Sequence, residues 1–353
     1  MESVRREAKA AFLDFEGTLV FEPPDTEGVD PSMTGRILPG VVEGLKRLQA
    51  EGYRLVLIPN REKRGEFMAP GADLGGLELG CLEPLQKEGI RFHRIFFCPH
   101  GAREKCPCRK PGAAVFKGFL RREKIDPELS VMVGDREVDV QFARKIGVWG
   151  LRKQTNGPFP RLASSVRTSR ETDIWVRCNL DGQGHFQVET GLPFFNHMLE
   201  QFSRHSLIDL RIRAKGDLHI DEHHLVEDVG LTLGKALSRA LGPRTGISRY
   251  GFLLPMDDTL AEVAVDLGGR PYLVFHCEFT RERVGDLPTE MVEHFLRSLS
   301  DALRANIHVQ VRYSRNEHHK IEAIFKALGR ALRMACEHDP RMEDCLPSTK
   351  GIL

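Results

Sequence analysis

The sequence has no hydrophobic run long enough to span a membrane and no excess of one charge. None of its apolar runs reaches 18 residues, and the amino-terminal MESVRREAKA is charged where a signal peptide would be apolar. Lys and Arg number 51 against 50 Asp and Glu, a net charge of +1, so no overall field attracts the protein to nucleic acid or membranes. We therefore expect a cytoplasmic protein that binds neither partner.

Disorder and collagen-like structure are also excluded. Of the residues, 41% are hydrophobic and 29% charged, which is the balance of a globular protein. At about 100 to 200 residues per domain, the length predicts two domains. The segment 151–170 has Gly157, Pro158 and Pro160, no acidic residue and no amphipathic period, so it is expected to be a linker. The expected domains are residues 1–160 and 167–353.

The first domain is predicted to be a Rossmann-like α/β domain. The apolar runs AAFLDF, RLVLIPN, RIFFC and SVMVGD alternate with the amphipathic segments VVEGLKRLQAEG and AAVFKGFLRREK. Such alternation predicts a parallel sheet with helices on both faces, and ligands of such sheets bind beyond the carboxyl ends of the strands. Asp14, Asn60 and Asp135 each fall at such an end.

The second domain contains an internal repeat. EHHLVEDVGLTLGKALSRAL (222–241) and EHHKIEAIFKALGRALRMAC (317–336) share Glu-His-His-x-x-Glu and a Leu-Gly pair at a constant offset. A further predicted helix with one histidine, His197 or His294, precedes each copy. Segments such as DLRIRAKG and NIHVQVRY alternate in polarity and are expected to be antiparallel strands. We expect an α+β domain of two duplicated sheet-and-helix units.

The repeated His-His-x-x-Glu pattern predicts metal binding. On a helix, Glu227 shares a face with His223 and His224, and the second copy repeats this arrangement. Adjacent histidines project about 100° apart, which suits two metals better than one. Imidazole with carboxylate suits Mn, Fe, Zn or Ni. One isolated His-His pair would more often be a surface feature or a satisfied polar contact, but packing does not require the pattern twice.

From about Arg167 onward, the chain resembles the imidazoleglycerol-phosphate dehydratases of histidine biosynthesis. The matching segments are RTSRETDI, NLDG, FFNHML, DEHHLVED, LPMDDTL, DLGGRPY, RVGDLPTEMVEHF, NEHHKIEAIFKALGRAL and LPSTKGIL. The resemblance implies Mn-dependent dehydration of imidazole glycerol phosphate to imidazole acetol phosphate. It also implies a homo-oligomer, formed through this domain, whose sites are completed between subunits.

The same resemblance implies roles for individual residues. One Mn²⁺ would be bound by His197, His224, Glu227 and His319. The other would be bound by His223, His294, His318 and Glu322. Glu171 is the candidate general acid or base, with His205 and Asp257 as possible helpers. Substrate and its phosphate would contact Gln201, Arg249, Arg270, Lys326, Ser348 and Lys350. For any one of these cations, a solvated surface charge is the alternative.

The segment AFLDFEGTLV resembles the haloacid dehalogenase phosphatases, in which a strand ends in Asp-x-Asp-Gly-Thr. The resemblance implies that Asp14 is a nucleophile that carries the phosphoryl group. Mg²⁺ would be bound by Asp14, the carbonyl of Glu16 and Asp135, with Asp139 in support. The phosphate would contact Asn60 and Lys110. A strand-end turn alone would explain the first motif, but it would not explain the ordered set.

Cysteines in the first domain predict a zinc site. Cys98, His100, Cys106 and Cys108 form Cys-x-His-x₅-Cys-x-Cys, four soft ligands within eleven positions. The alternative is a loop of free thiols, although exposed free thiols are a liability. The same loop occurs in histidinol-phosphate phosphatases. The whole chain therefore resembles the bifunctional histidinol-phosphatase/imidazoleglycerol-phosphate dehydratases, and histidinol phosphate is a second expected substrate.

A different class of function stays open at this point. The His-Glu clusters could build a metal-storage or structural metal centre in an assembling shell, with a non-catalytic phosphate-binding module at the amino terminus. Glu171, Arg249, Arg270 and Lys350 count against this alternative, because a storage centre would not need them.

Two departures from the phosphatase pattern bear on activity. Glu16 replaces the second Asp of the motif, the general acid, and its extra methylene moves the carboxyl group by about 1.5 Å. A displacement of about 1 Å can cost roughly 10²-fold in rate. Pro59 replaces the Thr or Ser before Asn60, and proline has neither a hydroxyl nor an N–H to donate. Each lost donor commonly costs roughly 10² to 10³-fold.

We therefore predict weak or absent histidinol-phosphatase activity, which the double variant Glu16→Asp/Pro59→Thr should raise because it restores the acid and the donor. The measurement is phosphate release from histidinol phosphate with Mg²⁺, on wild type and variant. Brisk wild-type turnover that the double variant fails to raise would show that the two departures do not matter.

Overall fold

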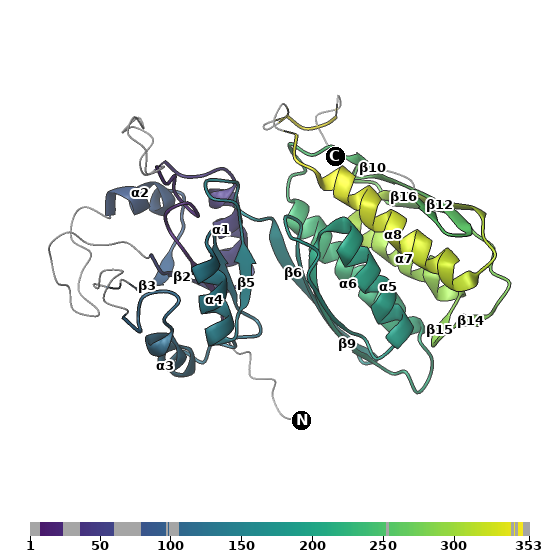
Figure 1. The fold of residues 1–353 in the computed structure, drawn as a ribbon, viewed down its shortest axis with the longest axis horizontal. Helices are drawn as coiled ribbons and strands as arrows, with labels where there is room; N and C mark the ends of the chain where they lie inside the picture. Colours follow the sequence, from purple (N-terminus) through teal and green to yellow (C-terminus); the bar gives the residue numbers. More distant parts are fainter. Residues whose placement is uncertain are drawn as a thin grey trace. The chain divides into compact units, whose positions relative to one another are not determined.

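The computed structural model describes residues 8–23, 36–59, 79–96, 98, 106–251, 254–339, 342 and 345–348. The chain divides into two compact units, Met1–Pro160 and Arg161–Leu353, whose ribbons are drawn in Figure 1. Three of the predicted site residues, Asn60, His100 and Lys350, lie outside the described residues. Within the described ranges, no helix is both long and apolar enough to cross a membrane.

The amino-terminal unit is built on a parallel sheet, which confirms the predicted Rossmann-like fold. The strand order is β3 (Phe92–Ile95), β2 (Tyr53–Leu57), β1 (Lys9–Leu13), β4 (Val131–Gly134) and β5 (Trp149–Arg152). The helices that follow β1 to β4 in turn are α1 (Val41–Ala50), α2 (Leu79–Lys87), α3 (Ala114–Arg122) and α4 (Glu137–Ile146). The predicted RIFFC strand begins two residues earlier than expected, at Phe92, and ends at Ile95.

The hydrophobic core of this unit covers its central strands and fixes the strand ends at which the predicted ligands lie. β1 and β4 are almost wholly buried, as expected for strands covered on both faces. The rings of Phe116 and Phe142, from α3 and α4, pack edge-on against Phe12 of β1. The strand order reverses at β1, whose neighbours are β2 and β4. Asp14 and Asp135 directly follow β1 and β4, at the switch point where such sheets bind ligands.

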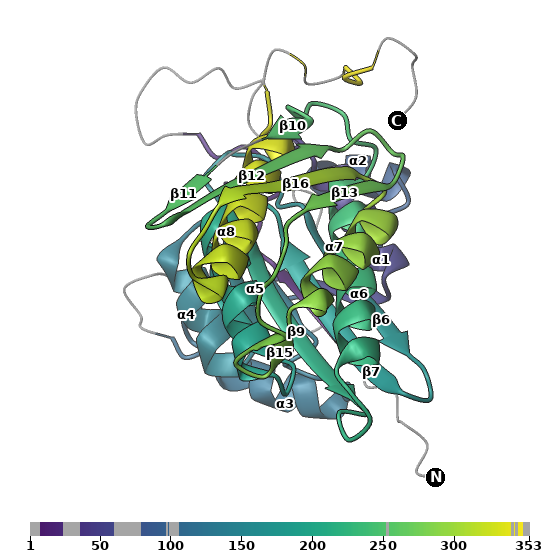
Figure 2. The ribbon, with the colours of Figure 1, turned by 90° about the vertical axis from the view of Figure 1, so that its right-hand side faces the viewer.

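The carboxy-terminal unit has helices between two sheets (Figures 1 and 2). The first sheet has the order β6 (Leu162–Thr168), β7 (Thr172–Asn179), β9 (Asp209–Gly216), β8 (Phe186–Glu189). The second has the order β10 (Tyr250–Gly251), β12 (Thr259–Asp266), β16 (Asn306–Tyr313), β13 (Tyr272–His276), and β11 (Leu254–Met256) also pairs with β12. The helices are α5 (Pro193–Ser206), α6 (His223–Leu241), α7 (Glu290–Leu303) and α8 (Glu317–Cys336). A small hairpin joins β14 (Arg283–Val284) to β15 (Leu287–Pro288).

The strand orders confirm the duplicated α+β unit. β7, β8, α5, β9 and α6 of the first half correspond in order and pairing to β12, β13, α7, β16 and α8 of the second. The expectation of purely antiparallel strands was wrong, because β8 pairs with β9 and β13 pairs with β16 in parallel. In each half, a helix crosses over between these two strands, and such a crossover returns the chain in its original direction.

The expected linker at 151–170 contains the boundary between the two units, at Pro160 and Arg161, but it is shorter than predicted. β5 extends to Arg152, and β6 occupies Leu162–Thr168. β6 pairs with β7 along its whole length, from Leu162 opposite Asn179 to Thr168 opposite Asp173. The sequence LASSVRT has too little hydrophobic contrast to indicate a strand by itself, so the strand depends on this pairing.

The helices pack across the repeat. α6 of the first half lies against α7 of the second, and α5 lies against α8. A Cβ atom at Gly234 would lie 2.7 Å from the Leu299 carbonyl oxygen, and one at Gly329 would lie 2.7 Å from the Phe202 carbonyl oxygen. The two glycines are the repeated Leu-Gly positions. Glycine therefore permits close approach of the helix backbones at both crossings.

We predict that Gly329→Ala destabilises the carboxy-terminal unit by about 1 to 3 kcal/mol, because the new methyl group meets backbone atoms that cannot move aside. Each unit has one tryptophan, Trp149 or Trp175. In a Trp149→Phe background, urea unfolding followed by Trp175 fluorescence isolates the relevant transition.

The matched control is Gly118→Ala, where the added methyl group has nothing within 4 Å in helix α3. That change should stabilise its own unit by up to about 1 kcal/mol, followed by Trp149 in a Trp175→Phe background. A Gly329→Ala protein as stable as its parent would contradict the close crossing.

Candidate metal and substrate sites

One histidine-glutamate cluster lies between α6 and α7. The ring centroids of His223 and His294 are 4.6 Å apart, and Nε2 of His223 is 3.4 Å from Oε2 of Glu227, one helical turn further along α6. All three side chains are half-buried. We call these residues cluster A. Its members come from both halves of the repeat, because the helices pack across it.

A second cluster lies between α5 and α8. Nε2 of His318 is 3.3 Å from Oε2 of Glu322, and Nε2 of His197 is 4.0 Å from Oε1 of the same carboxylate. These three groups are close enough together to hold one metal ion, and we call them cluster B. Burial acts to raise the pKa of Glu322, but Lys326 and the two histidines hold it below its usual value.

The grouping within one chain differs from the two predicted ligand sets. His197 lies beside His318 and Glu322, although the resemblance placed it with the other set. Glu227 likewise lies beside His223. Neither predicted set of four is assembled within the described part of a single chain.

The second histidine of each pair contacts a carboxylate outside its cluster. The rings of His223 and His224 are 6.2 Å apart with 80° between their planes, and those of His318 and His319 are 6.1 Å apart with 82° between them. Nδ1 of His224 lies 3.1 Å from Asp217. Nδ1 of His319 lies 2.6 Å from Asp258. Hydrogen bonds to these carboxylates raise the pKa of both rings.

Several predicted substrate residues adjoin cluster B. Gln201 and His205 follow His197 at four-residue intervals on α5, and Lys326 follows Glu322 by four on α8. Lys326 Nζ is 2.9 Å from Glu322 Oε1. Burial, followed by the charge of Lys326, lowers the pKa of His205.

Glu171 lies in an open hollow near His224. It is exposed in the turn between β6 and β7, and its backbone N–H donates to Ser169 Oγ at 3.1 Å. The hollow has a volume of about 330 Å³ and is lined by 168–173, 215–217 and His219. Asp217, the partner of His224, is therefore part of the same hollow. The charge of Glu171 also acts on His224.

The other predicted residues of this unit are dispersed. Arg249 pairs with both oxygens of Asp266, at 2.5 and 2.9 Å, and donates to the Pro347 carbonyl oxygen at 2.8 Å, directly before Ser348. Asp257 and Arg270 are exposed. Arg249 thus contacts the backbone next to Ser348, and its guanidinium already has a carboxylate partner.

The first glutamate of each Glu-His-His motif contacts the segment around the β14–β15 hairpin. Glu222 pairs with Arg283 of β14. Glu317 is buried and accepts from Thr280 Oγ1 at 2.8 Å. Asp286, in the hairpin turn, accepts from the Phe194 N–H at 2.9 Å, at the start of α5. These contacts join the starts of α5, α6 and α8.

In the amino-terminal unit, three buried carboxylates gather at the switch point. Asp14, Asp135 and Asp139 are at most 7% exposed and close enough to hold one metal ion. Lys110 Nζ is 2.5 Å from Asp14 and 2.7 Å from Asp139. Burial raises the pKa of Asp14 to about 6, although Lys110 opposes that rise.

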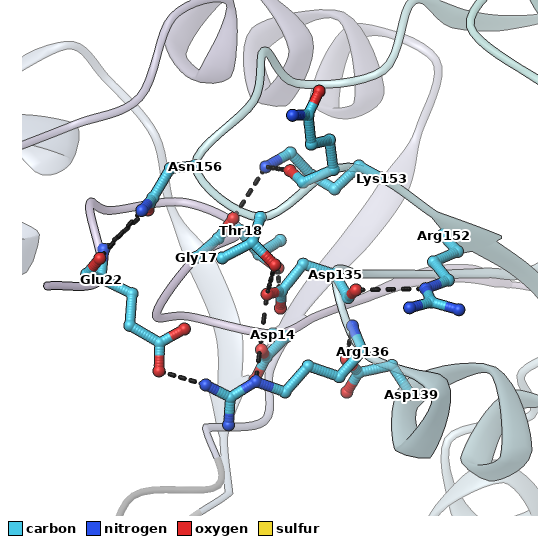
Figure 3. A network of polar contacts seen from close by, with 12 residues as sticks. Asp14, Gly17, Thr18, Glu22, Asp135, Arg136, Asp139, Arg152, Lys153 and Asn156 are labelled. Atoms are coloured by element: carbon cyan, nitrogen blue, oxygen red, sulfur yellow. Dashed lines mark hydrogen bonds and ion pairs between the residues drawn. The ribbon is translucent and has the colours of Figure 1, made fainter. Parts of the chain in front are cut away.

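Neighbouring residues fix Asp135 in place (Figure 3). Its two carboxylate oxygens accept from Thr18 Oγ1 at 3.2 Å and Thr155 Oγ1 at 2.7 Å. Gly17 has φ of 72°, and a Cβ there would be 2.6 Å from Asp135 Oδ2. The buried Lys153 donates to the Gly17 carbonyl oxygen at 2.8 Å. The motif therefore requires glycine at this position.

The two departures from the phosphatase motif lie just after β1 and β2. Glu16 is half-buried in the turn after β1, in a bridge with Val20. Pro59 is buried just beyond β2. The preceding Ile58 N–H donates to Leu13 at 2.7 Å, which keeps this strand end beside β1.

Three of the four predicted zinc ligands lie together. The sulfur of Cys108 is 2.6 Å from that of Cys106 and 3.2 Å from that of Cys98. The three can hold one metal ion. His100 lies outside the described residues.

Sequence reasoning missed Asp217, Asp258, Thr155 and Lys153. Asp258 is adjacent to the predicted Asp257 in LPMDDTL, and Asp217 lies just upstream of the first His-His pair, so their positions gave a weak signal. Thr155 and Lys153 fall in the segment that was expected to be a linker.

Comparison with known proteins agrees with this architecture. Residues 190–332 match the family model for imidazoleglycerol-phosphate dehydratase, and residues 107–152 match the HAD-hydrolase-like model. The histidine biosynthesis bifunctional protein HisB of Stenotrophomonas maltophilia is 44% identical over 357 residues, covering 97% of this chain and 99% of that protein. HisB of Xylella fastidiosa is 42% identical over 375 residues, with 97% and 99% covered. The imidazoleglycerol-phosphate dehydratase structure from Staphylococcus aureus is 39% identical and covers 50% of this chain and 99% of its own, with a TM-score of 0.46.

Fold and sequence matches together define a fused enzyme, with a HAD-like hydrolase domain followed by an imidazoleglycerol-phosphate dehydratase domain. The chain belongs to the family of the histidine biosynthesis bifunctional protein HisB. It is an imidazoleglycerol-phosphate dehydratase of histidine biosynthesis, and this confirms the predicted function over the metal-storage alternative. The two enzyme families that it joins are metal-dependent.

Proposed function

We propose that dehydration takes place at a two-Mn²⁺ site assembled from clusters A and B of different copies of the chain. The observation that carries this proposal is that each cluster supplies two imidazoles and one carboxylate, while His224 and His319 contact carboxylates outside the clusters of their own chain. A ligand set completed by a neighbouring copy uses all eight predicted residues. The proposed assembly is a homo-oligomer formed through the carboxy-terminal unit.

The residues present fit such a metal. Imidazole and carboxylate are the ligands that Mn²⁺ and related ions accept. Nε2 of His223 and His318 already point at carboxylate oxygens within 3.4 Å. Lys326 occupies one oxygen of Glu322 and is the cation that a bound metal would compete with. When bound, the metals would supply Lewis acidity to the imidazole ring of imidazole glycerol phosphate.

We propose that residues of this chain bind the substrate and transfer a proton. Glu171 would remove the unactivated C–H proton from the carbon next to the one that bears the hydroxyl group beside the ring, since it is exposed in the hollow next to His224. That hydroxyl group would leave, so that water is lost and the resulting enol rearranges to the ketone. His205 and Asp257 would assist, and Gln201 would orient substrate from α5. The substrate phosphate would be bound by Arg249, Arg270, Lys326, Ser348 and Lys350. Support for this comes from the approach of Arg249 to the Pro347 carbonyl oxygen, next to Ser348.

We infer a separate phosphoryl-transfer site in the amino-terminal unit, with histidinol phosphate as substrate. Asp14 would attack phosphorus, and Lys110 and Asn60 would contact the phosphate. Mg²⁺ would be bound by Asp14, Asp135 and the carbonyl of Glu16, with Asp139 in support. The gathering of three buried carboxylates around Lys110 supports this proposal. The reduced rate predicted from Glu16 and Pro59 applies to this site.

We also propose that Cys98, His100, Cys106 and Cys108 bind a structural Zn²⁺. The three sulfurs that the structure describes are mutually close, and thiolates are the ligands that a closed zinc site uses.

Exhaustive chelation should abolish dehydration, and Mn²⁺ should restore it, because the substrate ring depends on the two metals for activation. The assay follows formation of the carbonyl product from imidazole glycerol phosphate. Far-ultraviolet circular dichroism of the chelated protein serves as the control for unfolding. Undiminished dehydration by metal-free protein would rule out this mechanism.

Glu171→Gln should bind substrate but turn over at least about 10²-fold more slowly, the usual scale for losing a general acid or base. Asp173→Asn is the matched control, since Asp173 lines the same hollow but accepts from Thr168 Oγ1. Steady-state kinetics on both variants separate turnover from binding. Wild-type turnover by Glu171→Gln would assign the proton transfer to another residue.

A further inference from the structure

The second histidine of each His-His pair is held by a carboxylate outside clusters A and B. Nδ1 of His224 is 3.1 Å from Asp217 Oδ2, and Nδ1 of His319 is 2.6 Å from Asp258 Oδ1. An ionised carboxylate only accepts hydrogen bonds, so the ring proton lies on Nδ1 in both cases. This tautomer leaves the lone pair on Nε2, which is the atom then able to bind a metal.

Asp217 and Asp258 occupy positions of the two repeats that do not correspond to one another. β7 corresponds to β12 and β9 to β16. Asp258 directly precedes β12, and the residue that directly precedes β7 is Glu171. Asp217 directly follows β9, and the residue that directly follows β16 is Ser314. The two histidine–carboxylate contacts are therefore not copies of one ancestral contact that the duplication preserved.

In each half, one carboxylate is hydrogen-bonded to the histidine. In the second half, the Ser314 hydroxyl is 2.7 Å from Thr259 Oγ1 and donates to the Asn316 carbonyl oxygen, and Asp258 holds His319. In the first half, Asp217 holds His224 instead, and Glu171 stays exposed in the hollow. The first half thus has a second carboxylate, that of Glu171, near His224, and this carboxylate is not needed to orient the histidine.

We propose that Asp217 and Asp258 are positioning residues that fix the tautomer and direction of His224 and His319 toward the metals. By holding His224, Asp217 also leaves Glu171 available for proton transfer. This inference rests on the proposed metal-dependent function. It adds two residues that act through the histidines they contact.

The test is the Mn²⁺ affinity of the metal-free full chain, from the electron paramagnetic resonance signal of unbound Mn²⁺. Asp217→Ala and Asp258→Ala should each weaken binding by about 10 to 100-fold, the usual cost of losing a partner of a ligating histidine. The Asn variants should lose less, because the amide oxygen still accepts from Nδ1 without the charge. Asp173→Ala removes a carboxylate from the same hollow without touching a histidine, and it should keep the wild-type affinity.

The outcomes distinguish the inference from the proposed function. A wild-type chain that binds no Mn²⁺ contradicts the proposed function itself. If the wild type binds Mn²⁺ and both alanine variants bind it equally well, the positioning role is wrong. Where an alanine variant does not fold, the Asn variant, whose side chain has the same shape as Asp, provides the test. Weaker Mn²⁺ binding than wild type supports the positioning role, and equal binding overturns it.

Discussion

The close crossing of α6 with α7, and of α5 with α8, is the constraint on which the carboxy-terminal unit depends. Glycine at the repeated Leu-Gly position lets the backbones meet in each crossing. Because each crossing pairs a helix of one half with a helix of the other, the lone histidines His197 and His294 are brought to the His-x-x-x-Glu faces of the opposite halves. The clusters are therefore products of the duplication as a whole, and neither half could form one by itself.

The amino-terminal unit obeys a different constraint, the reversal of strand order at β1. That reversal places the ends of β1 and β4 side by side, so Asp14 and Asp135 converge although about a third of the chain separates them. Lys110 then lies between Asp14 and Asp139 with its charge fully buried. The buried ammonium group is stabilised by the two carboxylates beside it. Its positive charge in turn offsets the repulsion between those two carboxylates.

The sequence predicts best what depends on local pattern. The bounds of α6, α8, β9 and β16 follow from periodicity and the repeat, and the ligand types follow from residue chemistry. The grouping of ligands within one chain could not be predicted, because it depends on which helices cross. The contacts of Asp217 and Asp258 with their histidines depend on loop positions that no short motif records. β6 was missed because its stability comes from pairing with β7 rather than from its own composition.

The β14–β15 hairpin has a consequence for how this protein tolerates sequence change. Hairpin turns are usually among the segments that accept insertions most readily, because little is bonded to them. Here the segment is tied to the starts of α5, α6 and α8 through Asp286, Arg283 and Thr280, and it leads directly into α7. One residue added in the turn would separate Arg283, which holds the start of α6, from Asp286, which holds the start of α5, and from α7. A short surface turn is thus among the least permissive places in this unit for insertion.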